Sequence, residues 1–242
     1  MICSNKGGII IKKVRNEWKY SCSAREADRI NNRLSAILNK DAHSDKNGSY
    51  QVHTLYFDDY KNSCVRENDA GVAKRVKYRI RYYGNQYSTM KLERKEKING
   101  YCYKQSCRIS LAEYLMIMDG KANELIWQTE ELLLKWFCIC CMTRNFVPKA
   151  IIDYERTAYI EEISNIRVTL DANISVSDDF SRFLEGDYIR YPVQGKEEKI
   201  LEVKFDDILP SYIKNTITNR RMIPSAFSKY CVGRKNLQNR GR

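Results

Sequence analysis

One octapeptide alternates charged and apolar residues over its first six positions: Lys77-Tyr-Arg-Ile-Arg-Tyr-Tyr-Gly84. In a β-strand, residues two apart share a face, so Lys77, Arg79 and Arg81 lie together on one side. The opposite side carries Val76, Tyr78, Ile80 and Tyr82. We therefore interpret these tyrosines as packing residues, and we predict a strand with one strongly basic face and one apolar face.

The same alternation recurs in the other predicted strands. Their charged faces hold ten cations, namely Arg15, Lys19, Lys77, Arg79, Arg81, Lys91, Lys95, Arg156, Arg167 and Lys204. They also hold four acids, namely Glu17, Glu93, Asp171 and Glu202. One such face alone is typical of the solvated side of an amphipathic sheet. Like charges side by side on several strands cost energy unless an anion neutralises them, which favours faces turned inward around an anion and a metal cation.

The chain is predicted to form one α+β, β-rich domain over residues 1–242, with its core at about 10–236. Strands are expected at 10–22, 51–57, 74–83, 88–98, 101–110, 149–160, 166–175, 188–193 and 199–205. Helices are expected at 24–39, 111–143, 211–219 and 225–236, and Pro210 and Pro224 are expected to open the last two. These elements predict a closed eight-stranded antiparallel β-barrel with a charged lumen and helices packed outside.

Composition excludes several classes of protein. Hydrophobic residues make up 43% and charged residues 30% of the 242, too apolar for a disordered chain and too charged for a membrane protein. Lys135 interrupts the longest apolar run, 132–142, and cations follow residues 9–11, so neither a membrane span nor a secretory signal is expected. The nine cysteines form no paired CxxC motifs. They are expected to be reduced thiols in a cytoplasmic protein, without a zinc site.

The net charge of +12 predicts an anionic partner. Nucleic acid, anionic lipid and polyphosphates all carry the same kind of charge. A nucleic-acid binder would need cations outside the lumen, such as Arg234, Lys235, Arg240 and Arg242 at the C-terminus. A basic tail is more often simply solvated, so nucleic acid is not the expected partner.

Eight short motifs together resemble a known family. They are Arg15-Asn-Glu-Trp-Lys-Tyr20, Leu55-Tyr-Phe-Asp58, Lys77-Tyr-Arg-Ile-Arg-Tyr-Tyr-Gly84, Leu92-Glu-Arg-Lys95, Tyr154-Glu-Arg-Thr-Ala-Tyr159, Arg167-Val-Thr-Leu-Asp171, Leu201-Glu-Val-Lys204 and Phe227-Ser-Lys-Tyr230. In this order they resemble the VTC-type polyphosphate polymerase domain, a branch of the triphosphate tunnel metalloenzyme (CYTH-like) superfamily. The resemblance covers about residues 15–230 and implies an eight-stranded antiparallel tunnel.

The resemblance also implies roles for individual residues. The catalytic set would be Arg79, Arg81, Lys95, Arg156 and Lys229. Further phosphate or nucleotide ligands would be Lys19, Arg66, Lys104, Arg167 and Lys204. Glu202 resembles the carboxylate that holds Mn²⁺ or Mg²⁺, with Glu17 and Glu93 as further candidates. The implied reaction is metal-dependent transfer of the ATP γ-phosphate to a growing polyphosphate chain, for which positioning and charge neutralisation matter most.

Two departures from the wider superfamily bear on the reaction. Its hydrolases carry Glu-x-Glu on the first and last strands, whereas this chain has Arg15 and Ile200 at the first position of each. A site with fewer carboxylates holds fewer metal ions and therefore activates water less well. This favours transfer of the phosphoryl group to phosphate over its hydrolysis. A triphosphate hydrolase and a non-catalytic polyphosphate or nucleotide-binding module remain the alternatives. A separate membrane partner and the oligomeric state stay open.

Overall fold

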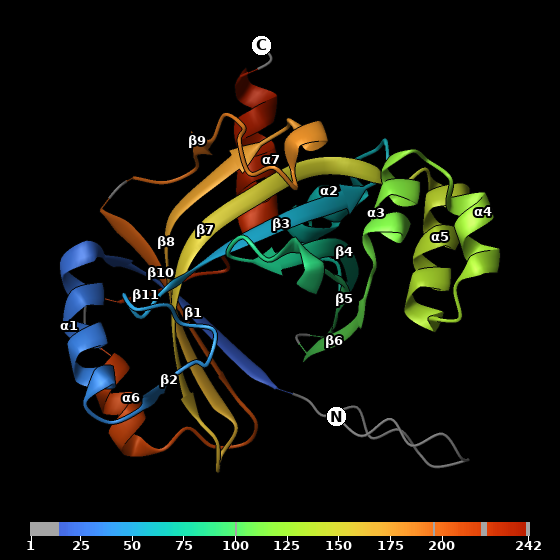
Figure 1. The fold of residues 1–242 in the computed structure, drawn as a ribbon. Coiled ribbons are helices and arrows are strands. Elements are labelled where there is room, and N and C mark those ends of the chain that lie inside the picture. The colour runs from blue at the N-terminus through green and yellow to red at the C-terminus, as the bar shows by residue number, and fades with distance from the viewer. Residues whose placement is uncertain (1–14, 100, 196, 219–221, 241–242) are drawn as a thin grey trace, which may run out of the picture.

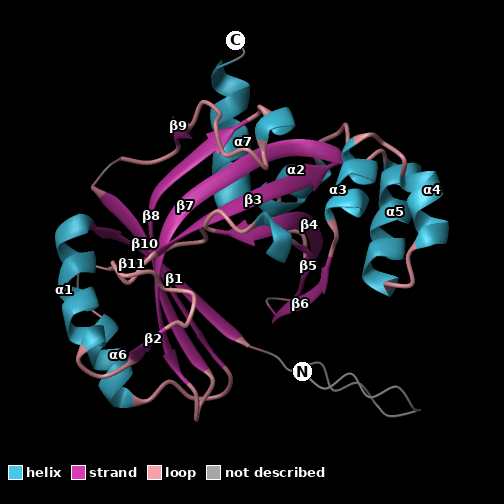
Figure 2. Cartoon of the chain, in the orientation of Figure 1, coloured by secondary structure: helices cyan, strands magenta, loops and turns pink. Residues whose placement is uncertain are grey.

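The computed structural model describes residues 15–99, 101–195, 197–218 and 222–240. Its main feature is one strongly curved antiparallel sheet (Figures 1 and 2), whose long strands follow the order β1-β10-β8-β7-β3-β4-β5-β6. These eight strands are β1 (Asn16–Ser23), β3 (Tyr50–Asp58), β4 (Lys74–Tyr83), β5 (Lys91–Ile98), β6 (Tyr101–Arg108), β7 (Val147–Glu161), β8 (Ile166–Ser177) and β10 (Glu198–Phe205). The short strands β2 (Asn39–Lys40), β9 (Tyr191–Pro192) and β11 (Ile223–Pro224) pair with β7, β8 and β1.

The prediction of an α+β, β-rich fold is confirmed, but the prediction of a closed barrel is wrong. The sheet is a curled half-barrel, because the edge strands β1 and β6 do not form a ladder. Over the described residues, the bridge between Arg15 and Cys102 is the single pairing that links these two edges. The outer edge of β1 is occupied instead by β11, which pairs with Tyr20 and Ser21. The bridge to β6 lies at Arg15, immediately before β1, so β11 and β6 meet this edge at different points along the chain.

Most predicted strands lie where the alternation placed them. The strand predicted at 74–83 coincides with β4, whereas the strand predicted at 188–193 is reduced to β9. Residues 10–14 of the first predicted strand lie outside the described part of the chain. The prediction that Pro224 opens a helix is wrong, because Pro224 lies in β11 opposite Tyr20 and the last helix starts at Lys229.

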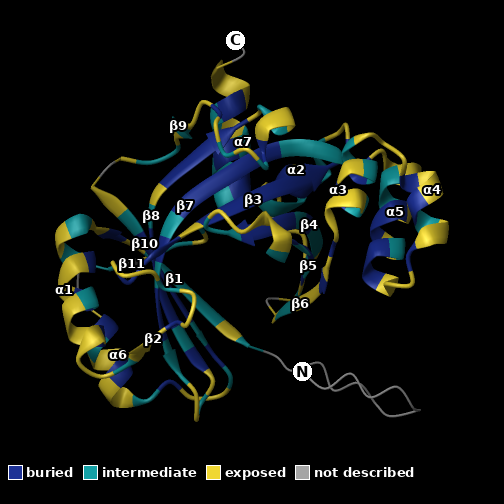
Figure 3. Ribbon diagram, in the orientation of Figure 1, coloured by how far each residue is buried: buried dark blue, intermediate teal, exposed yellow. Residues whose placement is uncertain are grey.

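The outer face of the sheet is apolar and covered by helices. The segment predicted at 111–143 forms α3 (Leu111–Met118), α4 (Ala122–Gln128) and α5 (Leu132–Arg144), which stand beside β4, β5 and β6 in Figure 1. Phe137 of α5 packs edge-on against Phe57 of β3, with ring centroids 4.9 Å apart, and lies 5.3 Å from the ring of Tyr78. Tyr78 and Ile80 are buried in this core, as the alternation along β4 predicted. Figure 3 shows that the neighbouring strands β3 and β7 are also buried over much of their length.

A second apolar core lies at the other end of the sheet. It is covered by α1 (Ala24–Ser35) and α6 (Ser211–Ile217), whose Leu34 and Ile213 are fully buried. Ser23 caps α1, since its hydroxyl accepts from the Glu26 backbone while the Glu26 carboxylate accepts from the Ser23 backbone. No described helix is long and apolar enough to cross a membrane.

The C-terminal helix α7 (Lys229–Arg240) packs against the concave face of the sheet. A side chain at Gly233 would collide with Ile152 and Val176, so the helix approaches the sheet at a residue that has none. Ile152 lies on the same face of β7 as Arg156, because residues two apart share a face. The contact of Gly233 with β7 and β8 places the first turn of α7, which includes Lys229, at the charged part of the concave face. The remaining short elements are α2 (Ser63–Asp69), η1 (Tyr87–Thr89) and η2 (Phe180–Arg182).

Candidate active site

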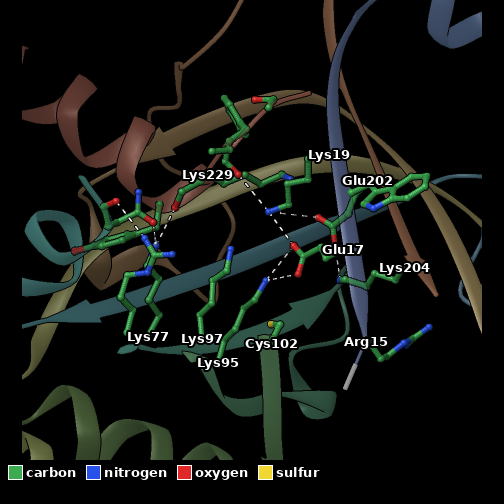
Figure 4. A pocket seen from close by; sticks show the side chains of 18 of the residues that line it. Arg15, Glu17, Lys19, Lys77, Lys95, Lys97, Cys102, Glu202, Lys204 and Lys229 are labelled. Carbon is green, nitrogen blue, oxygen red and sulfur yellow. Dashed lines mark hydrogen bonds and ion pairs between the residues drawn. The ribbon is translucent and has the colours of Figure 1, made fainter. Parts of the chain in front are cut away.

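A cavity of about 600 Å³ lies on the concave face of the sheet. Its described lining carries eleven cations: Arg15, Lys19, Arg75, Lys77, Arg79, Arg81, Lys95, Lys97, Arg156, Lys204 and Lys229. Two carboxylates, Glu17 and Glu202, lie among them, and Figure 4 shows both between Lys19, Lys95 and Lys204. The charged faces of the strands therefore do turn inward. Among the cations predicted for the site, Lys19, Arg79, Arg81, Lys95, Arg156, Lys204 and Lys229 are brought together here.

Beneath the β4–β5 wall of the cavity, one buried carboxylate holds three cations. Glu93 is 1% exposed and accepts from Arg79 Nε at 2.7 Å, with Arg81 Nη1 at 3.7 Å. Lys104 of β6 pairs with its other oxygen. Burial acts to raise the pKa of Glu93, but Arg79, Arg81 and Lys104 outweigh burial and hold that pKa well below its usual range. The carboxylate is ionised and sealed from solvent, so the structure does not offer Glu93 to a metal.

A second buried carboxylate supports the opposite wall. Asp171 is fully buried and accepts from Arg156 Nε at 2.6 Å and Nη2 at 2.8 Å, a bidentate pair. Lys229 Nζ lies 2.6 Å from Asp171 Oδ2. Burial acts to raise the pKa of Asp171, but Arg156 and Lys229 lower it to about 2. The carboxylate therefore holds one cation of β7 and one of α7 in fixed positions at the cavity.

The carboxylates that line the cavity are Glu17 and Glu202. Lys95 Nζ donates to both Glu17 oxygens, at 3.1 and 2.9 Å, and Lys19 Nζ lies 2.9 Å from Glu17 Oε1. Glu202 pairs with Lys204 and lies 3.9 Å from Lys19. Burial opposes ionisation of both carboxyls, yet the surrounding lysines lower the pKa of each below its usual range. Both are therefore ionised at neutral pH.

Tyr56 adds a polar group that the sequence analysis did not single out. Its hydroxyl accepts from Arg79 Nη1 at 2.9 Å, and its ring stacks on that of Tyr230 at 5.0 Å. Burial acts to raise the pKa of Tyr56, but Arg79, Arg81 and Lys77 outweigh burial and lower the pKa to about 8. Arg79 is thus held on two sides, by Glu93 and by this phenol.

Three predicted phosphate ligands lie away from the cavity. Arg66 is exposed on α2, and Lys104 faces Glu93 rather than the cavity. Arg167 pairs with Asp41 and donates to Tyr50 Oη at 2.8 Å. None of the three is among the lining residues, so the structure does not bring them to this site.

The lining also includes cations that the sequence analysis missed. Arg75 precedes Lys77 by two residues on β4, and Lys97 follows Lys95 by two residues on β5. The alternation that identified Lys77 and Lys95 contained the signal for both, because each lies one step further along the same face. Extending the pattern to the ends of the two strands would have found them.

The chain resembles several solved structures and matches a protein-family model. No curated protein matches the chain. The fold is similar to that of the PH1819 protein of Pyrococcus horikoshii OT3, at 11% identity and a TM-score of 0.44, with 94% of this chain and 99% of that chain covered. It is also similar to a provisionally assigned adenylate cyclase of Bacillus halodurans, at 10% identity and a TM-score of 0.45, with 84% and 86% covered. The family model of the VTC domain matches residues 14–238, and the chain therefore belongs to the VTC domain family.

Proposed function

We propose that the chain is a metal-dependent phosphotransferase that moves the ATP γ-phosphate onto a growing polyphosphate chain. The observation that carries this proposal is the cavity with eleven described cations and two carboxylates in its lining. Such an excess of positive charge in a partly desolvated space fits a substrate with several phosphates. Membership of the VTC domain family agrees with this substrate class.

The arginines are suited to orienting a triphosphate. Arg79 and Arg81 project from the same face of β4, and Glu93 holds both before any substrate arrives. Arg156 is held by Asp171 in the same way. Because these guanidinium groups are already ordered, binding and charge stabilisation require little rearrangement in the transition state. Each guanidinium can also bind phosphate oxygens through two N–H groups.

Glu17 and Glu202 fit a divalent cation that arrives with the nucleotide. The charge of Glu202 acts, after burial and Lys95, on the pKa of Glu17 and raises it, so the two carboxylates lie near one another, and both are ionised. No cluster of three acidic, histidine or cysteine ligands occurs in the described ranges. Phosphate oxygens and water would complete the coordination, as is usual for Mg²⁺. Mn²⁺ or Mg²⁺ bound there would neutralise charge on the transferring phosphoryl group.

The proposed reaction is an in-line displacement. A terminal oxygen of the polyphosphate chain, or of orthophosphate at initiation, forms a bond to the γ-phosphorus of ATP. The bond from that phosphorus to the oxygen it shares with the β-phosphate breaks, and ADP leaves with the electron pair. Lys19, Lys95 and Lys204 pair with Glu17 and Glu202. If these carboxylates held a divalent cation, the three lysines would be available to phosphate oxygens.

One assay separates this proposal from its alternatives. Purified protein is incubated with ATP and Mn²⁺, and the products are resolved on a gel stained for polyphosphate. A ladder with ADP release supports a polymerase. Orthophosphate without a ladder would instead indicate a triphosphate hydrolase, and ATP binding without turnover would indicate a binding module.

A matched pair of variants ties the activity to the cavity. We expect Arg81→Ala to lower kcat/KM by at least about 10³-fold, the effect typical of an arginine that stabilises phosphoryl transfer. Arg25→Ala makes the same chemical change on the exposed side of α1 and is expected to leave the rate unchanged. Equal rates for the two variants would show that catalysis occurs elsewhere.

A further inference from the structure

The outer side of α5 is apolar. Its inner side packs into the core, where Phe137 is fully buried. On the outer side, Leu132 is 71% exposed and Trp136 is 62% exposed, and Ile139 and Met142 are exposed as well. A surface helix normally turns polar side chains toward water, and a helix that is apolar all round is normally covered. The outer side of α5 is therefore an apolar surface that the described part of the chain leaves uncovered.

The exposed apolar residues form one stripe. Leu132, Trp136 and Ile139 are spaced by four and three residues, so they lie on one side of the helix, and Met142 extends the stripe by three more residues. Three residues connect α4 to α5, and such a short connection joins antiparallel neighbours. Trp127 of α4, which is 86% exposed, thus lies at the same end of this hairpin as Leu132. We call these five residues the hairpin face.

The hairpin face is large enough to form the centre of an interface. A tryptophan side chain offers about 200 Å², so the exposed parts of Trp127 and Trp136 together offer about 300 Å². A stable protein–protein interface buries about 800 Å² of each partner around a centre rich in aromatic and apolar side chains. The two tryptophans alone therefore supply about a third of the area that a stable interface needs.

The charge of the hairpin limits what can cover this face. Residues 121–144 carry three cations and three acids, a net charge of zero, whereas the whole chain carries +12. Nucleic acids and anionic lipid surfaces bind through an excess of cations, which this hairpin lacks. Lys135 and Glu130, which pair at 3.4 Å, place both signs of charge next to the stripe. The face therefore fits a partner that is apolar and has no large net charge where it binds.

The hairpin is also separate from the basic cavity. No residue of α4 or α5, both fully described, is among the residues that line the cavity. Figure 1 shows these two helices at the opposite end of the molecule from α1 and α6. Two copies of a chain with a charge of +12 repel each other, and this repulsion is weakest where neutral surfaces meet. The hairpin offers such a neutral surface.

We propose that the hairpin face binds the same face of a second copy of this chain, in a dimer with twofold symmetry. A twofold contact requires a surface that is complementary to itself. An apolar helix stripe meets this requirement, because ridges of side chains on one helix pack into grooves on the other. A rim with both signs of charge meets it as well, since each sign can face its opposite. The contact uses no residue of the cavity, so the dimer does not depend on the proposed function.

Sedimentation equilibrium of the full chain tests the dimer. Over a series of concentrations, we expect the average mass of the wild type to rise from that of one chain toward that of two. Trp136→Glu places a charge in the middle of the stripe and is expected to raise the dissociation constant by at least about 30-fold, as for the loss of a central aromatic contact. Leu132→Glu is expected to act in the same direction. Both positions are exposed, so urea unfolding should show that both variants remain folded.

Ile163→Glu is the matched control. Ile163 is 97% exposed in the turn between β7 and β8, outside the hairpin. The same change from an apolar to an acidic side chain is expected to alter the dissociation constant there by less than about twofold. A wild type that stays monomeric at every concentration would overturn the inference. A dimer that all three variants weaken equally, or that none of them weakens, would overturn it too.

Vesicle flotation separates the dimer from a lipid-binding face. The wild type and Trp136→Glu are each mixed with vesicles of phosphatidylcholine and phosphatidylserine. We expect either no binding or binding that is equal in the two proteins, because the cations of the chain lie outside the hairpin face. Binding by the wild type that Trp136→Glu abolishes would assign the face to a lipid surface and overturn the dimer.

Discussion

Glu93 and Asp171 lie beneath the walls of the cavity, whereas Glu17 and Glu202 form part of its surface. All four carboxylates pair with Lys or Arg, and all four have lowered pKa values. They differ in access, since Glu93 is 1% exposed and Asp171 is fully buried, while Glu17 keeps 15% of its side chain exposed. The buried pair is closed to the cavity, whereas the lining pair is in contact with it.

This difference explains how a strongly basic cavity can exist before substrate binds. An unpaired buried guanidinium would be costly, so Arg79, Arg81 and Arg156 need acids behind them. Those acids share a sheet face with the guanidinium groups that they pair with, but they are not among the lining residues of the cavity. The lining acids pair with Lys19, Lys95 and Lys204 instead. If Glu17 and Glu202 hold a divalent cation, as proposed, these three lysines become available to phosphate.

The largest expected effect comes from removing a buried carboxylate. Asp171→Asn leaves Arg156 and Lys229 without their acid, and breaking a buried ion pair in this way costs about 3–5 kcal/mol of unfolding free energy. Urea unfolding measures the loss. Asp187→Asn makes the same change on a side chain that is 93% exposed and is expected to cost less than about 0.5 kcal/mol. Equal stability of the two variants would remove the distinction between buried and lining acids.

The second largest expected effect is on the Mn²⁺ concentration that the activity requires. Glu202→Gln removes a lining carboxylate, and we expect the Mn²⁺ concentration for half-maximal activity to rise by about 10- to 100-fold. Asp171→Asn is expected to leave that concentration unchanged, because its carboxylate cannot reach a metal in the cavity. Glu130→Gln, on a side chain that is 97% exposed, is the charge-matched control. A shift of the same size in Asp171→Asn would contradict the assignment of the metal to the lining pair.

The pH dependence of stability gives a smaller effect. The pKa of Asp171 falls from about 3.9 in an unfolded chain to about 2 in the folded protein, so its contribution is present above the unfolded value and disappears as the pH falls toward 2. The difference in unfolding free energy between wild type and Asp171→Asn should therefore shrink by about 2 kcal/mol between pH 5 and pH 2. Urea unfolding at a series of pH values measures it, and a constant difference would mean that the carboxylate is not the charged partner of Arg156.

The smallest effect is spectroscopic and tests how Arg79 is held. The pKa of Tyr56 is lowered to about 8, so part of the tyrosinate absorbance should appear near pH 8 and be lost in Tyr56→Phe. Because the folded pKa lies below the unfolded value, the wild type should also gain stability over the variant as the pH rises from 8 to 10. Burial raises the pKa of Tyr114 to about 12, so Tyr114→Phe should leave the step near pH 8 intact. Loss of that step in both variants would contradict the contact between Arg79 and Tyr56.

Much of the cavity wall could be predicted from single strands. The alternation in β4 correctly placed Arg79 and Arg81 on one face and Tyr78 and Ile80 in the core. Arg66 shows the limit of transferring roles by motif spacing, since α2 leaves it exposed while its neighbour Asn68 reaches the cavity. Closure of the barrel was also mispredicted, because pairing between the two edges of a sheet depends on distant parts of the chain and leaves no signal in the alternation within a strand.

The sequence alone determined which side chains share a strand face, since the alternation of a β-strand is a local property of the backbone. It therefore specified a basic inner surface and an apolar outer one. Only the tertiary structure decided which acids are sealed and which stay accessible, because Glu93 and Glu17 occupy equivalent positions on charged faces. Their burial depends on neighbours from distant parts of the chain, with Glu93 enclosed by Arg79, Arg81 and Lys104, and Glu17 left beside the open edge of the sheet.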